Sequence, residues 1–494
     1  MDILLIIILS VLTFITRVIN LLKTPIFTDE AIYIRWAQIG LADPAHRYIS
    51  LTDGKQPLLT WLMYPFLLIF SDPLFAGRIV SVLSGILAVI GIYLLAKILF
   101  NRKTAVAASL LYIFSPFTLV YDRLALMDSL LAAIAVWSLY LQVLLVKYLR
   151  LDIALLLGIT VGLGLMTKSS AMFFLYLLPA GLLLFNFKLK DSGKILLKWI
   201  LLSFLSIIIA QVMFNSLRLS PLFYIIEQKN YSFILTFPEF IQNPWRLFQP
   251  NLYGLMTFLR DYLTVPVIML VTVNLFVTVF RKNFKVLLLF IWFAVPFLAL
   301  AAFGKILFPR FILFMCLPLL LIAADLLADL FNFARTKMKF IYIGLILILI
   351  NPFYNSINLI SDPVHADIPV IDRNQLFDDW PSGYGVREVV AFLELEAEDK
   401  KIVVGTEGTF GLNPAVYEIY LKKNENVIIR GYWPVNNVPQ ELLDFAEIYP
   451  TYLVFKDKQL IPDNWPLKLI AKYRRGLGNT YLYFFQVIPE NGSI

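Results

Sequence analysis

Two adjacent carboxylates, Asp29 and Glu30, follow the first apolar run of the chain. Beside a membrane, such a pair costs desolvation free energy unless water, a counter-ion or a reaction partner compensates it. The chemistry open to carboxylates is proton transfer or the binding of a cation. The structural alternative is a helix cap, in which Thr28 or Asp29 accepts backbone N–H bonds at the start of a helix expected from Glu30 to Ile39. Taken alone, the pair leaves both interpretations open.

The elements that must position this pair are those of a polytopic membrane protein. Only 15% of the 494 residues are charged, 60% are hydrophobic and the mean hydropathy is +0.77. Apolar runs of roughly 17 to 25 residues, long enough to cross a bilayer, recur between Ile3 and Asn358. The run from Ile3 to Leu22 lacks a basic n-region and a small-residue cleavage site, so we expect it to be retained as the first span. The single cysteine, Cys316, excludes an intrachain disulfide and a Cys-based zinc site.

Basic residues outnumber acidic ones, with 42 Lys and Arg against 34 Asp and Glu and a net charge of +8. Because the basic residues form short clusters between apolar runs, they indicate membrane topology and not nucleic-acid binding. Placing all the clusters on the cytoplasmic side predicts about eleven spans, with the N-terminus inside and the C-terminus outside. The clusters are Arg102-Lys103, Lys147 with Arg150, Lys188–Lys198, Arg281–Lys285 and Arg335–Lys339. The spans are expected near residues 3–22, 75–100, 104–121, 127–146, 152–167, 171–186, 195–214, 256–280, 286–303, 309–331 and 340–358.

The apolar segment Pro57–Phe70 is too short for a full crossing, at about 14 residues against the roughly 20 required. We therefore expect an interfacial or re-entrant helix there, on the outer face. This topology collects acidic and basic residues from distant parts of the sequence on that face. An active-site cavity at the membrane boundary needs such a convergence, although loops are polar for other reasons too. The residues are Asp29, Glu30, Asp53, Lys55, Arg78, Asp122, Arg123, Asp128, Lys168, Lys305 and Arg310, together with the loop 215–255.

From about Ile360 onward the chain is richer in charge and has no spanning run. Helical spacing alternates there with strand-like runs, which predicts a small α/β domain outside the membrane. The turn Gly405–Gly408 follows an expected strand; its glycines are weak evidence for phosphate binding, and we expect them to shape the turn. The alternating elements are expected at 385–398, 401–406, 414–422, 426–432, 440–448, 451–455 and 481–488. The expected domains are 1–358 in the membrane, with outer loops 23–74 and 215–255, and 359–494 as the soluble domain.

Six short motifs occur in one order along the expected outer face. They are Asp29-Glu30-Ala31-Ile32-Tyr33, Lys55-Gln56-Pro57-Leu58 with Trp61, Arg78-Ile79-Val80-Ser81 with Gly85, Arg123 to Asp128, Thr167-Lys168-Ser169, and Pro309-Arg310-Phe311. In type and order they resemble the GT-C superfamily of glycosyltransferases that use polyprenyl-phosphate sugars. The closer likeness is to the branch of protein O-mannosyltransferases and of the aminoarabinose transferases that modify lipid A. Gln56, Ser169 and Phe311 stand where the family pattern has Pro, Gly and Tyr, and these departures bear on subfamily and substrate.

The resemblance implies a GT-C-like membrane fold and a sugar transfer from a polyprenyl phosphate to an acceptor hydroxyl, with inversion, on the extracytoplasmic side. Asp29 matches the catalytic acidic residue of the family and would take the proton of the hydroxyl. Glu30 would point about 100° away on a helix, where it would orient the acceptor or bind a cation. Asp128 would support the site from the second outer loop, or else pair with Arg123. That pair requires a break in the helix, because residues five apart lie about 140° apart on a continuous one.

The leaving group implied by the resemblance is a lipid phosphate, which is already a stable anion and has little need of a general acid. Cations should neutralise it instead, because Arg suits bidentate phosphate contact and Lys acts as a point charge. The alternative for each cation is a side chain that extends from a helix end toward water. The phosphate-binding candidates are Lys55, Arg78 and Arg310, with Arg123 and Lys168 in second rank. Tyr33 and Trp61 are the expected substrate-binding aromatics.

No cofactor is expected to be required, although adjacent carboxylate oxygens are compatible with a divalent cation. His46 beside Asp43 is more typical of a solvated residue than of a metal ligand. The expected partners are the polyprenyl-phosphate-linked sugar, a lipid, protein or glycan acceptor, and membrane lipid, with no nucleic acid. The aromatic and basic loop 215–255 is expected to act as an interfacial lid or as passive packing. The competing functions are a transporter or flippase, for which no corresponding halves are found, and an inactive scaffold.

Overall fold

The computed structural model describes residues 1–336 and 341–489. The predicted basic residues Lys337 and Lys339, and residue 340 of the last predicted span, lie outside this range. The chain divides into two compact units. The first comprises Met1–Ile19, Tyr48–Trp61 and Ile79–Pro369, and the second comprises Asn20–Arg47, Leu62–Arg78 and Val370–Ile494.

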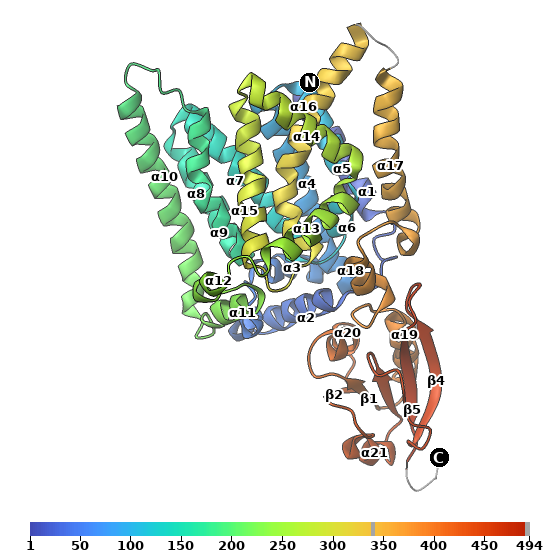
Figure 1. The fold of residues 1–494 in the computed structure, drawn as a ribbon. Helices are drawn as coiled ribbons and strands as arrows, with labels where there is room; N and C mark the ends of the chain where they lie inside the picture. Colours follow the sequence, from blue (N-terminus) through green and yellow to red (C-terminus); the bar gives the residue numbers. More distant parts are fainter. Residues whose placement is uncertain (337–340, 490–494) are drawn as a thin grey trace. The chain divides into compact units, whose positions relative to one another are not determined.

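The first unit is built from helices, several of them long and apolar (Figure 1). Among the described residues, five helical stretches are long and apolar enough to cross a membrane, or six if one bent pair counts as a single span. The five are Pro73–Leu99, Met127–Tyr148, Ser192–Leu219, Phe284–Phe303 and Pro309–Phe333. The remaining main helices are α1 (Asp2–Val18), α5 (Arg102–Ile113), α6 (Pro116–Tyr121), α8 (Leu151–Leu165), α13 (Phe248–Leu263), α14 (Val265–Arg281) and α17 (Ile341–Ser361).

Several predicted spans are interrupted in the structure, so the predicted number of about eleven is not confirmed. The span expected at 104–121 breaks between α5 and α6, where Pro116 has no N–H to donate and disfavours helical geometry at Ser115. The span expected at 256–280 is the bent pair α13 and α14, whose axes differ by 109° at Thr264, just before Val265-Pro266. The span expected at 171–186 is a series of short turns, with α9 (Met172–Tyr176) followed by a 3-10 stretch (Leu178–Leu184).

Helices α8 and α10 (Ser192–Asn215) lie side by side because two glycines remove the bulk between them (Figure 1). A Cβ at Gly158 would lie 2.8 Å from both Ile209 Cβ and the Ser206 carbonyl oxygen, and one at Gly162 would lie 2.6 Å from Met213 Sδ. Small residues four apart allow this close backbone approach, which apolar helices in lipid rely on for packing.

The second unit contains a five-stranded sheet in the order β2-β1-β3-β5-β4 (Figure 1). Strand β1 (Ile402–Glu407) runs parallel to β2 (Val427–Tyr432) and β3 (Thr451–Phe455), and β5 (Tyr481–Val487) runs antiparallel to β3 and β4 (Leu467–Arg474). The predicted alternation of helix and strand in this region is confirmed by α19 (Val386–Glu396), α20 (Leu412–Leu421), α21 (Gln440–Ala446) and four of the strands. Strand β4 was not predicted; it is an exposed edge strand carrying Lys468 and Lys472, which are typical of edges that must not pair further.

The second unit also includes the helix that carries the acidic pair. Helix α2 (Thr28–Ala42) packs on α20, where Arg35 Nε lies 2.6 Å from Glu418 Oε2 and Gln38 donates to the Ile419 carbonyl at 2.9 Å. The compact unit therefore draws on the early loop as well as on the region after residue 358. Helix α3 (Leu58–Ile69), at 12 residues, has the short length expected for Pro57–Phe70.

We expect Gly158→Ala to lower the melting temperature of the protein relative to Gly193→Ala. The added methyl at Gly158 meets a backbone oxygen, and overpacking costs about 1–3 kcal/mol. A Cβ at Gly193, at the start of α10, has nothing within 4 Å and reports only the gain in helix propensity. Thermal melts of both variants in detergent, followed by tryptophan fluorescence, measure the difference. Equal melting temperatures would show that α8 and α10 are not in tight contact.

Candidate active site

The acidic pair lies in the first turn of α2, and its two members have different environments. Helix α2 begins at Thr28, after Phe27 in an extended conformation, and the Phe27 N–H donates to Glu30 Oε2 at 2.9 Å. The capping bond therefore comes from Glu30, and the Thr28 hydroxyl instead donates to the Pro381 carbonyl at 2.9 Å. Glu30 is completely buried, whereas Asp29 is only partly buried. Of the two, Asp29 is the more accessible to solvent.

Arg78 and Glu30 form a buried ion pair in which neither side chain is exposed. The Arg78 Nε and Nη2 atoms donate to the two Glu30 oxygens at 2.8 and 2.7 Å. The other N–H groups of Arg78 donate to the carbonyls of Leu21, Thr24 and Pro25 at 2.7, 2.9 and 2.9 Å. All five guanidinium donors are thus used, and in this structure none is left for the lipid phosphate that the sequence assigned to Arg78. The pair instead ties the 21–25 turn to the start of α2.

Three predicted phosphate ligands gather around two aromatic rings in the first unit. We call Lys55, Lys168, Arg310, Phe233 and Phe311 the cation–aromatic cluster. Lys55 Nζ lies 5.3 Å from the Phe233 ring centre and Lys168 Nζ lies 4.6 Å from that of Phe311. The Arg310 guanidinium carbon lies 5.8 Å from the Phe311 ring centre, and the two rings are 6.0 Å apart. Aromatic faces attract cations, so the two rings gather three basic side chains from separate loops in one place.

Asp128 partners Lys168 and not Arg123. Lys168 Nζ donates to Asp128 Oδ1 at 2.7 Å, and Asp128 is buried in the first turn of α7 (Met127–Tyr148). The carboxylate fixes the ammonium in place while the side chain of Lys168 remains 25% exposed. Asp128 therefore acts on the cluster through Lys168.

Two departures from the resembled pattern, Gln56 and Ser169, directly follow Lys55 and Lys168 and contact each other, and the third, Phe311, is a member of the cluster. Gln56 Nε2 donates to Ser169 Oγ at 2.7 Å, and the Leu58 N–H donates to the Met166 carbonyl at 3.1 Å. These bonds join the loop that carries Lys55 to the loop that carries Lys168. Phe311, the third departure, supplies the ring beneath Lys168. Gln56 and Ser169, which both depart from the resembled pattern, thus contact each other.

The loop 215–255 contributes Phe233 as the last residue of α11 (Ile225–Phe233), and a second short helix, α12 (Phe237–Gln242), follows. The Lys305 N–H donates to the Phe233 carbonyl at 2.8 Å, and Lys305 Nζ contacts Glu239 Oε1 at 3.1 Å. Backbone and side-chain hydrogen bonds from Thr236, with the Lys305 ammonium, lower the pKa of Glu239 to about 2. Asp53 and Lys229 form a further ion pair that ties α11 to the loop before Lys55. These contacts hold the part of the loop that carries α11 and α12 in place.

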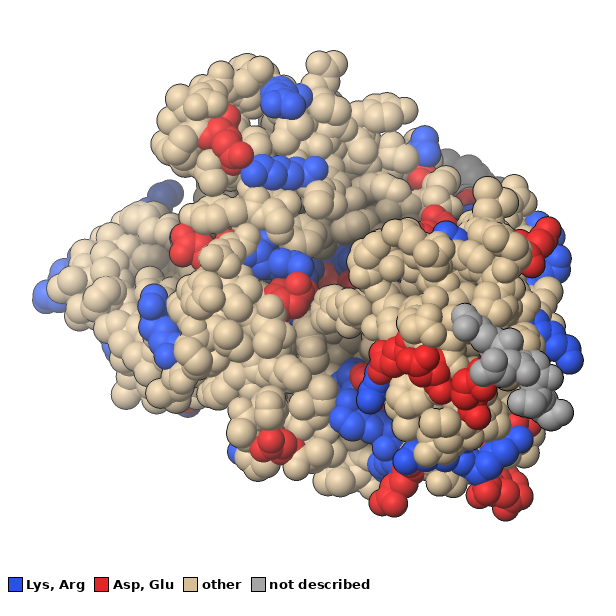
Figure 2. Space-filling view, turned by 90° about the horizontal axis from the view of Figure 1, so that it is seen from below, with Lys and Arg blue, Asp and Glu red and all other residues tan. Residues whose placement is uncertain are grey.

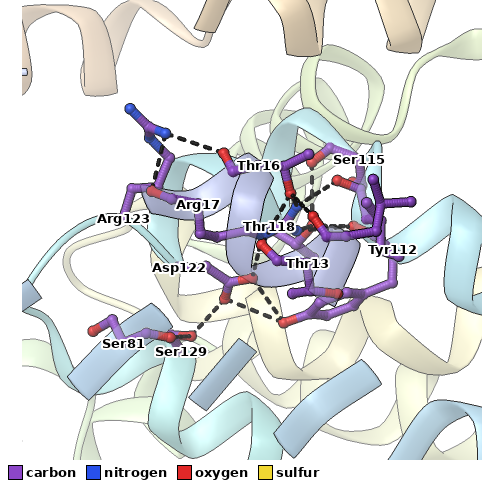
Figure 3. Close-up of polar contacts among 12 residues, drawn as sticks. Thr13, Thr16, Arg17, Ser81, Tyr112, Ser115, Thr118, Asp122, Arg123 and Ser129 are labelled. Carbon is purple, nitrogen blue, oxygen red and sulfur yellow. Dashed lines mark hydrogen bonds and ion pairs between the residues drawn. The ribbon is translucent and has the colours of Figure 1, made fainter. Parts of the chain in front are cut away.

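Arg123 belongs to a buried polar network at the end of α1 (Figure 3). Its Nη1 atom donates to the carbonyls of Thr16, Arg17 and Ile19 at 3.1, 3.1 and 2.7 Å, which satisfies the last turn of the helix. Beside it, Arg17 Nε pairs with Asp122 Oδ2 at 3.2 Å, with both side chains buried. Arg123 thus holds the end of α1, and its predicted role in phosphate binding stays a prediction.

The Arg17–Asp122 pair was missed from the sequence, although a charged residue inside an apolar run is itself a signal. Tyr112 and Ser129 hydroxyls donate to the Asp122 carboxylate at 2.9 and 2.5 Å (Figure 3). Gly85 of the third motif leaves room for this carboxylate, because a Cβ there would lie 2.6 Å from Asp122 Oδ2. The glycine of that motif is therefore explained by packing.

The two predicted substrate-binding aromatics lie in different units. Tyr33 is buried in the second unit with its ring 5.8 Å from that of Trp36, which in turn lies 6.2 Å from Phe410. Trp61 is partly exposed in the first unit, edge-on to Tyr48 at 5.6 Å. Tyr33 therefore packs behind the acidic turn, and Trp61 is the more accessible of the two.

Charged side chains are sparse on the face seen in Figure 2, where Lys and Arg occur in patches beside Asp and Glu on a mostly uncharged surface.

Within the described residues, no group of three or more His, Cys, Asp or Glu side chains is placed to hold a metal ion.

A helical multi-pass membrane domain, a small α/β domain and loop motifs rich in carboxylates and cations define the GT-C class of fold. Residues 54–214 match the family model described as dolichyl-phosphate-mannose-protein mannosyltransferase. That segment contains Lys55, Trp61, Arg78, Asp128 and Lys168. No curated protein gives a significant match to the chain.

Solved structures with the same fold include ArnT from Cupriavidus metallidurans in the apo state, with a TM-score of 0.60, 15% identity, and coverage of 98% of this chain and 97% of that one. The same ArnT bound to undecaprenyl phosphate gives a TM-score of 0.59 and 14% identity, over 100% and 99% of the two chains. The archaeal oligosaccharyltransferase AglB from Archaeoglobus fulgidus, in complex with an inhibitory peptide and a dolichol-phosphate, gives 0.55 and 14%, over 91% and 69%. The GT-C resemblance and the GT-C fold are confirmed, and the chain is an integral multi-pass membrane protein.

We expect Arg78→Met to destabilise the protein by about 3–5 kcal/mol, because Glu30 would remain buried without its counter-ion. The double variant Arg78→Met, Glu30→Met removes both charges and should recover part of that loss. Arg150→Met, at an exposed pair with Asp152, is the matched control and should melt close to the wild type. Denaturation in nanodiscs measures all three. An Arg78→Met protein as stable as Arg150→Met would contradict the role of the buried pair.

Proposed function

We propose that the protein is an inverting glycosyltransferase that moves a sugar from a polyprenyl-phosphate donor to an acceptor hydroxyl on the extracytoplasmic side of the membrane. The observation that carries the proposal is the cation–aromatic cluster, which unites Lys55, Lys168 and Arg310 from three separate family motifs. Two relatives of the same fold have been solved with a polyprenyl phosphate bound, ArnT with undecaprenyl phosphate and AglB with dolichol-phosphate.

The proposed step is a single displacement at the anomeric carbon. The acceptor oxygen forms its bond to that carbon as the bond from the carbon to the phosphate oxygen breaks, and the electron pair of the broken bond leaves with the polyprenyl phosphate. Asp29 takes the proton of the acceptor hydroxyl, which suits its partial exposure at the start of α2. The leaving phosphate needs charge compensation more than a proton, and Lys55, Lys168 and Arg310 supply it.

The other predicted site residues receive supporting roles in this proposal. Glu30 and Arg78 hold the turn that presents Asp29, and Asp128 positions Lys168. Arg123 secures α1. Trp61 is proposed to contact substrate, and Tyr33 to pack behind Asp29.

We expect Asp29→Asn to lower sugar transfer by about 10²–10⁴-fold, because the amide cannot accept the proton. Mass spectrometry of envelope glycolipids, glycoproteins and glycans, with and without the wild-type protein, identifies the product; complementation with each variant then measures transfer. Asp152→Asn, at an exposed position, is the control and should behave as the wild type. An Asp29→Asn protein that transfers sugar at the wild-type rate would overturn the mechanism.

Assays of donor binding and transport distinguish a glycosyltransferase from a flippase or transporter. They also distinguish a loss of activity from a loss of folding. Undecaprenyl phosphate should raise the melting temperature of the wild type and of Asp29→Asn alike, but not that of Lys55→Met with Arg310→Met. If the protein were a flippase or transporter, the Asp29→Asn variant would still move the lipid-linked sugar, and no glycosylated product would form. Parallel assays with EDTA and with Mg²⁺ decide whether a divalent cation takes part.

We expect the second unit and the basic loop at 188–198 to face opposite sides of the membrane. The single native cysteine, Cys316, is buried, so introduced cysteines can be labelled selectively. Asp463→Cys, in an exposed turn of the second unit, should react with an impermeant maleimide in intact cells. Lys188→Cys should react only after permeabilisation. Labelling of both in intact cells would contradict the proposed orientation.

A further inference from the structure

The C-terminal sheet has a topological switch point between β1 and β3. From β1 the chain passes through α20 to β2 on one side, and then through α21 to β3 on the other side of β1. Because these three strands are parallel, the loops that leave β1 and β3 diverge at the carboxyl ends of the strands. In open α/β sheets, ligands bind in the crevice expected at such a switch point.

Lys456 directly follows β3 at this crevice and is buried to all but 8% of its surface. Its ammonium lies 4.8 Å from the ring centre of Trp380. Among the residues that the structure describes, Lys456 Nζ makes no hydrogen bond and no ion pair with any side chain or carbonyl. A buried ammonium without an oxygen partner is costly unless an anion completes it.

Hydrogen bonds hold the backbone of Lys456 in place. The Glu407 carboxylate accepts the N–H groups of Lys456, Asp457 and Lys458 at 2.8, 2.7 and 3.1 Å, so it is occupied with the turn. Arg475 Nη2 donates to the Lys456 carbonyl at 2.6 Å. Burial lowers the pKa of Lys456, and the nearby carboxylates of Glu407 and Asp457 oppose that shift.

The loop after β1 closes over the same ammonium with two glycines. Gly408 and Gly411 have φ of +117° and +108°, a backbone conformation that side chains rarely adopt. A Cβ at Gly408 would lie 3.4 Å from Lys456 Nζ, and one at Gly411 would lie 3.8 Å from it. Asn413, in the same loop, has both side-chain polar atoms buried without a hydrogen-bond partner. The loop that follows the predicted turn Gly405–Gly408 thus carries unsatisfied polar atoms.

The acidic turn of α2 borders this crevice within the same unit. The Cβ position at Gly411 that lies 3.8 Å from Lys456 Nζ lies 3.7 Å from Thr28 Cγ2. Thr28 directly precedes Asp29, the proposed base. An anion held by Lys456 would therefore lie near the first turn of α2, which carries Asp29.

We propose that Lys456 and the 408–413 loop form an oxyanion-binding subsite for a phosphate or carboxylate group of the acceptor. That the anion belongs to the acceptor rests on the proposed function, but binding of the anion itself can be measured without turnover. The subsite shares no residue with the cation–aromatic cluster, whose lysines and arginine lie in the first unit.

The test uses the full-length protein in nanodiscs, with inorganic phosphate and acetate as probes at matched ionic strength. Phosphate, acetate or both should raise the melting temperature of the wild type, and Lys456→Met should weaken that response about tenfold or more in concentration. Lys458→Met is the matched control, because that lysine also lies over a tryptophan ring, Trp465, at 5.3 Å. Lys456→Arg keeps the charge and should retain most of the response. The stronger of the two anions identifies the acceptor group.

Undecaprenyl phosphate binding should be unchanged in Lys456→Met, and the KM for the acceptor identified by mass spectrometry should rise about tenfold with the donor KM unaltered. Equal responses of wild type and Lys456→Met to both anions would overturn the subsite. That result is independent of Asp29→Asn, whose retained activity would overturn the proposed function and leave an anion response at Lys456 standing.

Discussion

The buried ion pair between Arg78 and Glu30 is the contact on which the acidic turn depends. Two charges removed from water are tolerated only when each satisfies the other and their remaining donors and acceptors are bonded. Here Glu30 accepts two hydrogen bonds from Arg78 and one from the Phe27 N–H. The other N–H groups of Arg78 donate to three carbonyls of the preceding turn. The geometry of that turn and the start of α2 are thereby set together, which leaves Asp29 presented on a rigid element.

The same physics identifies further cations with a structural role. Arg17 and Arg123 resemble Arg78 in that carbonyls or a buried carboxylate satisfy them, and they hold the end of α1. Lys55 and Arg310 lie over aromatic rings, which attract a cation without removing its charge. Arg78, all of whose donors are taken by oxygen atoms of the protein, therefore has a positioning role.

Motif order in the sequence predicted much of the candidate site, because each motif pairs a residue type with a loop position. Lys55, Lys168 and Arg310 were all named as phosphate ligands, and the structure brings them together. Arg78 and Arg123 were named for the same reason, since the sequence cannot show how many donors a guanidinium has already used. Asp128 was placed between two alternatives, and its partner proved to be Lys168, forty residues away along the chain. The partner of Gln56 likewise lies on a distant loop.

The sequence by itself determined the class of the protein, because apolar runs, charge clusters and alternating elements are local properties with fixed periods. It determined the helices and most strands of the C-terminal region, but not the exposed edge strand β4, whose burial pattern carries little alternation. Only the tertiary structure decided which spans are continuous, since Pro116 and the bend at Thr264 act through backbone geometry. It also decided that Glu30 is buried and Asp29 is not, because burial depends on the distant Arg78 and on what packs around each carboxylate.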